Sequence, residues 1–145
     1  MLVAWYIIVK GCTVSTDGGL FIMKSPAPSK YESGMSGQKE AEQFLQKKGY
    51  KIVQRNYRIK TGEIDIIASQ NNYIIFIEVK FRRNLSHGYP REAVTYSKQQ
   101  RIIKTALHYI GTSNLTSVDF RFDVIEVLGT TGNVHINHIE NAFEC

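Results

Sequence analysis

The sequence predicts an α/β domain in which a mixed β-sheet is flanked by helices. Three observations support this: two segments have apolar residues at helical spacing, five segments are rich in β-formers, and their order is α-β-β-β-α-β-β. A chain of 145 residues suits one domain that buries a core without disulfides or structural metal. The 43% hydrophobic and 21% charged content excludes wholesale disorder, collagen-like repeats and a disulfide scaffold.

The first 34 residues differ from the rest of the chain. The opening apolar run is too short to span a bilayer and lacks the basic start of a signal peptide, and a Gly-, Ser- and Pro-rich stretch follows it. We therefore expect residues 1–34 to form a poorly ordered extension, with the true start at Met23 or Met35, and residues 35–145 to form the domain. The two cysteines, Cys12 and Cys145, have no metal-ligand spacing, which favours a cytoplasmic setting without a membrane partner.

The first helix is predicted over residues 36–48. Its apolar stripe includes Ala41, Phe44 and Leu45, Ser36 is the expected N-cap, and Gly49 is the expected stop. A strand over residues 50–59 follows.

Two β-rich segments, 63–68 and 73–81, flank a short polar stretch and predict a hairpin. A turn at Asn71-Asn72 would place Asp65 opposite Glu78 and Glu63 opposite Lys80, all on one face. The same face carries Ile67, Ile74 and Phe76, and the other carries Ile64, Ile66, Ala68, Ile75, Ile77 and Val79. Both faces are thus apolar apart from four charges at one end.

The remaining elements complete the expected sheet. A loop over 82–90 precedes a helix over roughly 91–111, which Gly111 is expected to end, with apolar residues from Ala93 to Ile110 at helical spacing. Two further strands, 119–128 and 134–139, surround a turn at Thr130–Asn133.

The facing acids Asp65 and Glu78 carry the chemical information. Two carboxylates roughly 5 Å apart repel each other and are costly in a buried face unless a cation compensates. A hard divalent cation such as Mg²⁺ is one answer, and a salt bridge with Lys80 is the other. With metal and water bound, a lysine on the same face would suit phosphodiester hydrolysis.

Basic residues are concentrated in the middle of the chain. Residues 39–104 hold 14 Lys and Arg against six acids, and residues 105–145 hold one Arg against five acids. This distribution indicates a polyanionic partner such as nucleic acid, although a solvated basic surface would look the same. The candidate phosphate contacts are Arg55, Arg58, Lys60, Arg82, Arg83 and Lys98.

Several motifs resemble a known family. Asp65 followed by Glu78-Val79-Lys80 resembles the core of the PD-(D/E)-x-K nuclease superfamily, whose members include restriction endonucleases and Holliday-junction resolvases. The wider sequence from about Gly37 to Val127 resembles the bacterial YraN-like family of that superfamily. The motifs are Gly49-Tyr50, Arg55-Asn56-Tyr57, GEIDII from Gly62, FIEVK from Phe76, Ala93-Val94-Thr95, Lys98-Gln99 and RFDVI from Arg121.

The resemblance implies a restriction-endonuclease-like core and a role for each matching residue. Asp65 and Glu78 would hold Mg²⁺ or Mn²⁺ with the Val79 carbonyl, and Lys80 would be the catalytic lysine. Glu63 would support the site or add a ligand. Lys98 and Gln99, at the start of the long helix, would lie nearby.

One position departs from the family pattern. A Gly-Glu pair usually opens the first helix, but Gln38 follows Gly37 here. Because a neutral amide is a weaker Mg²⁺ ligand, this change puts metal affinity in doubt unless Glu42, one helical turn on, substitutes.

Three functions follow as hypotheses. The first is a metal-dependent endonuclease that hydrolyses DNA by attack of an activated water, and it can act as a homodimer. The second is a non-catalytic nucleic-acid-binding protein with a degenerate nuclease fold. The third is an interaction protein whose basic strip meets an acidic partner.

Overall fold

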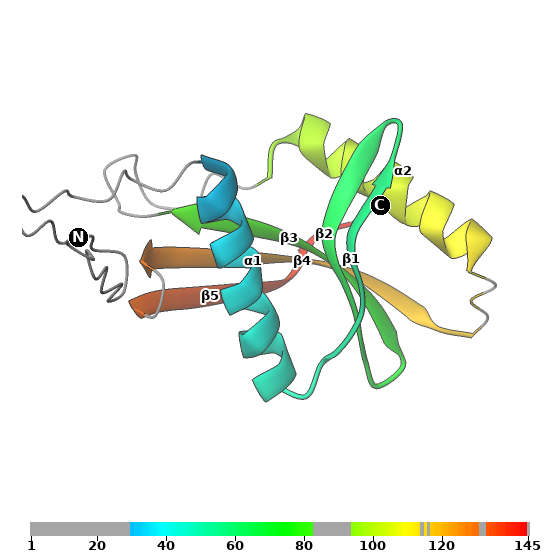
Figure 1. Ribbon diagram of the computed structural model, residues 1–145. Coiled ribbons are helices and arrows are strands. Elements are labelled where there is room, and N and C mark those ends of the chain that lie inside the picture. The colour runs from blue at the N-terminus through cyan, green and yellow to red at the C-terminus, as the bar shows by residue number, and fades with distance from the viewer. Residues whose placement is uncertain (1–29, 83–93, 114, 116, 131–132, 145) are drawn as a thin grey trace, which may run out of the picture.

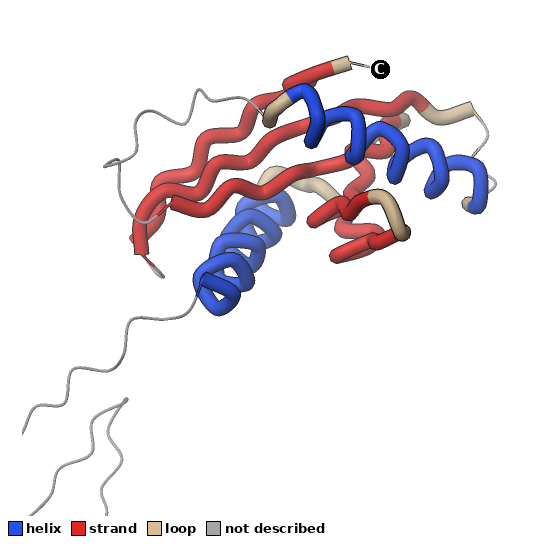
Figure 2. The backbone as a smooth tube through the Cα atoms, turned by 90° about the horizontal axis from the view of Figure 1, so that it is seen from above, coloured by secondary structure: helices blue, strands red, loops and turns tan. Residues whose placement is uncertain are grey.

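The protein has one five-stranded mixed sheet with a helix on each face. The computed structural model describes residues 30–82, 94–113, 115, 117–130 and 133–144, with side chains from residue 37. The strand order is β1-β2-β3-β4-β5, and Figures 1 and 2 show the sheet between α1 and α2. The α/β class and the order α-β-β-β-α-β-β are as predicted.

The element bounds lie close to the predicted ones. In chain order the elements are α1 (Lys30–Lys47), β1 (Lys51–Ile59), β2 (Gly62–Gln70), β3 (Tyr73–Arg82), α2 (Tyr96–Thr112), β4 (Asp119–Thr130) and β5 (Asn133–Phe143). Three neighbouring pairs are antiparallel, while β3 and β4 are parallel and α2 lies between them in sequence.

The helix ends differ most from expectation. Ser36 lies inside α1, which begins six residues before the predicted start, so it is not the N-cap. Gly111 lies inside α2, whose C-cap is Ser113; Thr95 is the N-cap, so α2 also begins later than predicted. Such local signals are weak, and tertiary context overrides them. By contrast, Gly49 follows α1 with a φ of 83°, as a helix stop requires.

Part of the predicted organisation lies outside the described residues. The extension expected over residues 1–34 belongs mostly to this part and stays a prediction, and so does the loop after Arg82 that contains Arg83. Among the residues that are described, no helix is long and apolar enough to cross a membrane.

The hairpin of β2 and β3 has the predicted register. Pairs run from Gln70–Tyr73 to Ile66–Ile77, and Asn71 has the positive φ of 52° that the tight turn needs. The ladder ends there, however. The expected pairs Asp65–Glu78 and Glu63–Lys80 are not part of it, which corrects the extrapolated register.

The sheet divides beyond Ile66 and Ile77. The first residues of β2 pair with β1, for example Glu63 with Arg58, whereas the last residues of β3 pair with β4. In Figure 1 the β1–β2 arm turns away from β3, β4 and β5. We call this division the fork. It follows from strong strand twist, because β2 cannot follow both partners once they diverge.

Two apolar cores form, one on each face of the sheet. The α2-side core contains Ile67, Ile74, Phe76, Ile102, Ala106 and Phe122. The α1-side core contains Ala41, Leu45, Ile66, Ile75, Ile77 and Ile125. The predicted faces of the hairpin are therefore correct except at Ile64, which packs in the α2-side core. Ile64 belongs to the part of β2 that bends away with β1.

Candidate metal and nucleic-acid site

Asp65 and Glu78 meet at the fork. Asp65 lies near the start of β2, and its Oδ2 accepts a hydrogen bond of 2.8 Å from the backbone N–H of Val79 on β3. The Asp65 side chain thus accepts a hydrogen bond from the main chain of Val79, the residue that follows Glu78. The fork therefore keeps the two carboxylates in one neighbourhood even though their backbones are not paired.

Burial makes both carboxylates costly to ionise. It raises the pKa of Asp65, against the lowering effect of the Val79 N–H and of Lys98. Burial, together with the nearby charge of Asp65, raises the pKa of Glu78 from 4.5 to about 7. Mutual repulsion of this kind is what the facing acids predicted from sequence.

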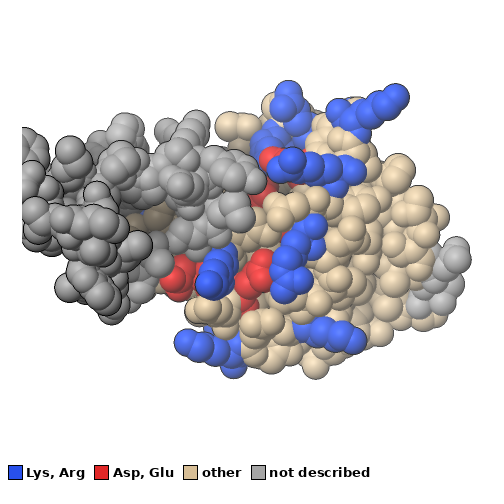
Figure 3. All heavy atoms as spheres, in the orientation of Figure 1, with Lys and Arg blue, Asp and Glu red and all other residues tan. Residues whose placement is uncertain are grey.

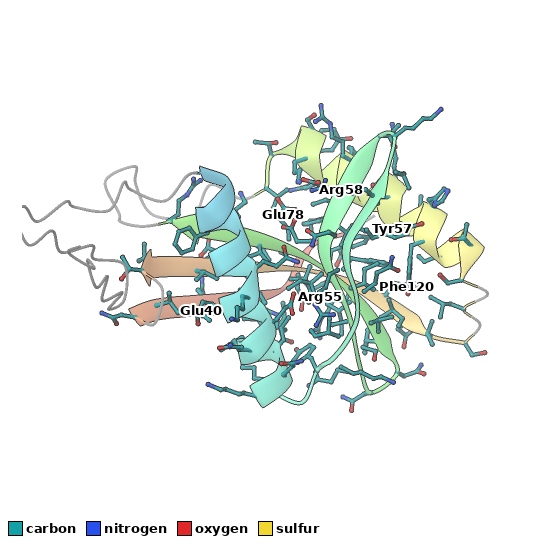
Figure 4. The ribbon with its side chains drawn as sticks, viewed as in Figure 1. Glu40, Arg55, Tyr57, Arg58, Glu78 and Phe120 are labelled. Carbon is teal, nitrogen blue, oxygen red and sulfur yellow. The ribbon has the colours of Figure 1, made fainter. Side chains whose placement is uncertain are left out.

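The cation beside Glu78 comes from α2. Lys98 Nζ lies 3.1 Å from Glu78 Oε2, and the Glu78 side chain is only 11% exposed. Glu78 Oε2 is buried, and Lys98 is the partner that the described structure gives it. In Figure 4, Glu78 lies near the N-terminal end of α2. The salt-bridge alternative is thus realised by Lys98.

The donor set fits a hard divalent cation with few protein ligands. Asp65 and Glu78 supply carboxylate oxygens, and Mg²⁺ binds through one or two carboxylates with several waters. Within the described residues no three His, Cys, Asp or Glu side chains are grouped to hold a metal. Ligation by the Val79 carbonyl would add a third oxygen and stays a prediction.

Lys80 and Glu63 both lie close to this pair. The charge of Lys80 acts to lower the pKa of Glu78, and that of Glu63 acts to raise the pKa of Asp65. Glu63 is engaged by Arg58, with 2.9 Å between Oε2 and Nε. Its position beside Asp65 suits a supporting group.

Gln38 reaches the site from the other face of the sheet. Its Nε2 donates a 3.1 Å hydrogen bond to the main-chain carbonyl of Asp65. Glu42, the residue expected to substitute for a glutamate at position 38, pairs with Arg55, with 2.8 Å between Oε2 and Nε. The side chain of Gln99, also predicted near the site, donates to the Val94 carbonyl and fixes the segment before α2.

A pocket of about 330 Å³ opens beside this cluster, between the β1–β2 turn and the first turns of α2. We call it the basic pocket. Its charged lining is Arg58, Lys60, Glu63, Lys98 and Arg101. Arg101 was missed from sequence, although its position three residues after Lys98 places both on one helical face.

The β1–β2 turn and α2 approach closely at Gly62. A Cβ there would lie 2.6 Å from Thr105 Oγ1 and 2.9 Å from the Arg101 carbonyl oxygen.

The other predicted basic contacts are more dispersed. Arg55 is tied to Glu42, and Arg82 ends β3 as an exposed residue. On the face seen in Figure 3, the visible acidic side chains lie beside lysines and arginines. The surface is therefore mixed in charge, and the basic pocket is the feature that gathers several cations.

A second buried polar cluster stabilises the sheet away from the fork. Asp123 accepts hydrogen bonds from Arg121, His138 and the Asn141 N–H. Burial alone would raise the pKa of Asp123, but these bonds outweigh it and lower the pKa. Arg121 and Asp123 thus form an ion pair, with 2.9 Å between Nε and Oδ1.

Comparison with known proteins identifies the family of the chain. The chain is 45% identical to the "UPF0102 protein" of Caldicellulosiruptor saccharolyticus, over 79% of this chain and 99% of that protein. It is 50% identical to the relatives of Alkaliphilus metalliredigens, over 76% of this chain, and Clostridioides difficile, over 77%, in each case over 96% of the relative. The printed names state no activity. Residues 37–127 match Uncharacterised protein family UPF0102, the YraN-like family, and the chain belongs to it.

Proposed function

We propose that the protein is a metal-dependent endonuclease that hydrolyses phosphodiester bonds of DNA. Asp65 and Glu78 would hold Mg²⁺ or Mn²⁺ at the fork. When bound, such a cation supplies Lewis-acid activation of water and of the phosphate. Water would add to phosphorus as the P–O bond to the leaving oxygen breaks.

The chain's own residues divide the remaining work. Lys80 brings an ammonium close to Glu78, where it can orient the attacking water or stabilise charge on the phosphate. The Val79 N–H fixes the Asp65 carboxylate. The basic pocket offers lysine and arginine side chains that can contact the phosphates of the DNA strand on either side of the scissile bond.

The observation that carries the proposal is the pair of buried acids itself. The fold buries Asp65 and Glu78 in a site that raises both pKa values, with Lys98 beside Glu78 Oε2. The structural Asp123 differs, because its hydrogen bonds from Arg121, His138 and the Asn141 N–H lower its pKa. Strongly perturbed acids beside lysines are typical of functional sites.

The test is cleavage of labelled linear duplex, single-stranded and four-way-junction DNA with Mg²⁺, Mn²⁺ or chelator. Wild-type protein is compared with Lys80→Ala and with Lys104→Ala, an exposed lysine on α2 outside the basic pocket. We expect metal-dependent cutting by wild type and Lys104→Ala and its loss in Lys80→Ala. Cutting that persists in chelator, or equally in both variants, would refute the proposal.

A non-catalytic DNA-binding protein is the second candidate, and Gln38 favours it. The hydrogen bond from Gln38 Nε2 to the Asp65 carbonyl needs an N–H donor, which an ionised glutamate lacks. This candidate predicts salt-sensitive DNA binding without cutting by wild type. If Gln38→Glu then restored cleavage, the departure at this position would account for the lost activity.

A further inference from the structure

We propose that Lys98 is a displaceable counter-ion that couples metal binding at Asp65 and Glu78 to phosphate binding in the basic pocket. The inference rests on the proposed metal site and adds a linkage between it and the nucleic-acid backbone. Its starting point is that Lys98 belongs to both places. It pairs with Glu78 at 3.1 Å and also lines the basic pocket.

Lys98 and a divalent cation compete for the same carboxylate. The oxygen nearest Lys98 Nζ is Glu78 Oε2, which is buried. A cation bound there would meet the ammonium at close range in a largely buried site, where charge repulsion is strong. Metal binding therefore requires Lys98 to leave Glu78.

The pocket that receives Lys98 is already rich in positive charge. Arg58, Lys60 and Arg101 line it, and Glu63, its one acidic lining residue, is paired with Arg58. Lys98 also lies in the first turn of α2, which has no acidic residue to offset the positive end of the helix dipole. Moving the ammonium into this pocket is unfavourable until an anion is present.

An anion in the pocket therefore helps the metal to bind. A phosphate there would hold the displaced Lys98 and release Glu78, and by linkage a bound metal would strengthen phosphate binding equally. The ligand class is a phosphate group, either free or within a nucleic-acid strand. This coupling would keep the affinity for metal low until the phosphate backbone of a nucleic-acid strand is bound.

The experiment is a Mg²⁺ titration of uniformly ¹⁵N-labelled protein, followed at the Val79 amide, which donates to the Asp65 carboxylate. It is run at pH 8.5, above the pKa of about 7 of Glu78. Wild type is compared with Lys98→Gln and with Lys104→Gln as the charge-matched control on the same helix. Each protein is titrated in chloride and in sulfate, a phosphate-shaped free anion, at equal ionic strength.

Lys98→Gln should bind Mg²⁺ about tenfold more tightly than wild type in chloride, within the usual range of couplings between sites. Sulfate should strengthen Mg²⁺ binding by wild type and Lys104→Gln and leave Lys98→Gln unchanged. In a second arm, Ca²⁺ should tighten binding of a fluorescently labelled 20-mer duplex to wild type more than to Lys98→Gln.

Unchanged or weaker Mg²⁺ affinity in Lys98→Gln would overturn the coupling while leaving the metal site standing. Absence of Mg²⁺ binding in every protein would overturn the proposed function together with this inference. A response to sulfate without a response in the DNA arm would overturn nucleic acid as the ligand and assign the pocket to a free anion.

Discussion

Replacing Glu78 with glutamine should change how the stability of the metal-free protein depends on pH. The pKa of Glu78 is raised from 4.5 to about 7, so between these values the folded state binds more protons than the unfolded state. The contribution of Glu78 to stability is therefore full below pH 4.5 and is lost as the pH rises through 7, because the free energy of unfolding falls with pH in that window. Each pKa unit is worth about 1.4 kcal/mol, so the expected loss is about 3 kcal/mol.

The assay is urea unfolding in EDTA at several values between pH 4 and pH 8.5. The quantity to follow is the difference in unfolding free energy between Glu78→Gln and wild type. That difference should shift by about 3 kcal/mol in favour of the variant as the pH rises. The comparison of slopes removes the pH-independent cost of burying an amide at this position.

Glu144→Gln is the matched control, because Glu144 is exposed near the C-terminus. Its difference from wild type should stay within a few tenths of a kcal/mol across the same range. If the difference between Glu78→Gln and wild type were equally flat, or moved the other way, the reasoning about the buried acids would be refuted.

Three further variants test the site and its supports. Asp65→Asn should abolish metal-dependent cleavage while its thermal midpoint in EDTA at pH 8 stays at or above that of wild type; an unfolded variant would contradict this. Gly62→Ala should destabilise by about 1–3 kcal/mol in urea unfolding, because its Cβ would lie 2.6 Å from Thr105 Oγ1; a neutral result would show that α2 shifts freely. Asp123→Asn should cost about 3–5 kcal/mol in the same assay, since it breaks the ion pair of the fully buried Asp123 with Arg121; a loss below 1 kcal/mol would place this cluster with ordinary exposed pairs.

Local sequence was enough to predict the hairpin and the positions of its two acids. The Asn71-Asn72 turn and strict alternation give the register as far as Ile66 and Ile77, and they place both acids at the same end. The prediction of a costly carboxylate pair in need of a cation followed from that register alone. Both raised pKa values agree with it.

Contacts between distant segments could not be predicted in the same way. The extrapolated pairing of Asp65 with Glu78 is wrong because the β2–β3 ladder ends at Ile66 and Ile77, beyond which β2 continues with β1 alone and β3 with β4 alone. The cation expected beside Glu78 was a divalent metal or Lys80, and nothing in the local sequence indicated Lys98, which comes from a helix whose placement depends on the whole α2-side core. For the same reason, the sequence around Glu42 did not indicate that its carboxylate would form an ion pair with Arg55.

The fork leaves main-chain groups of β2 and β3 without a partner in the sheet. β2 keeps its pairing with β1 and β3 keeps its pairing with β4, so two inner edges remain where the β2–β3 ladder stops, and main-chain groups along them have no partner in that ladder. Two of these groups already bind side chains: the Val79 N–H holds Asp65, and the Asp65 carbonyl holds Gln38. The Asp65 carboxylate thus takes the place of a ladder partner for β3. Asparagine at position 65 keeps a side-chain oxygen that can accept from the Val79 N–H, so the Asp65→Asn variant reports on chemistry and not on architecture.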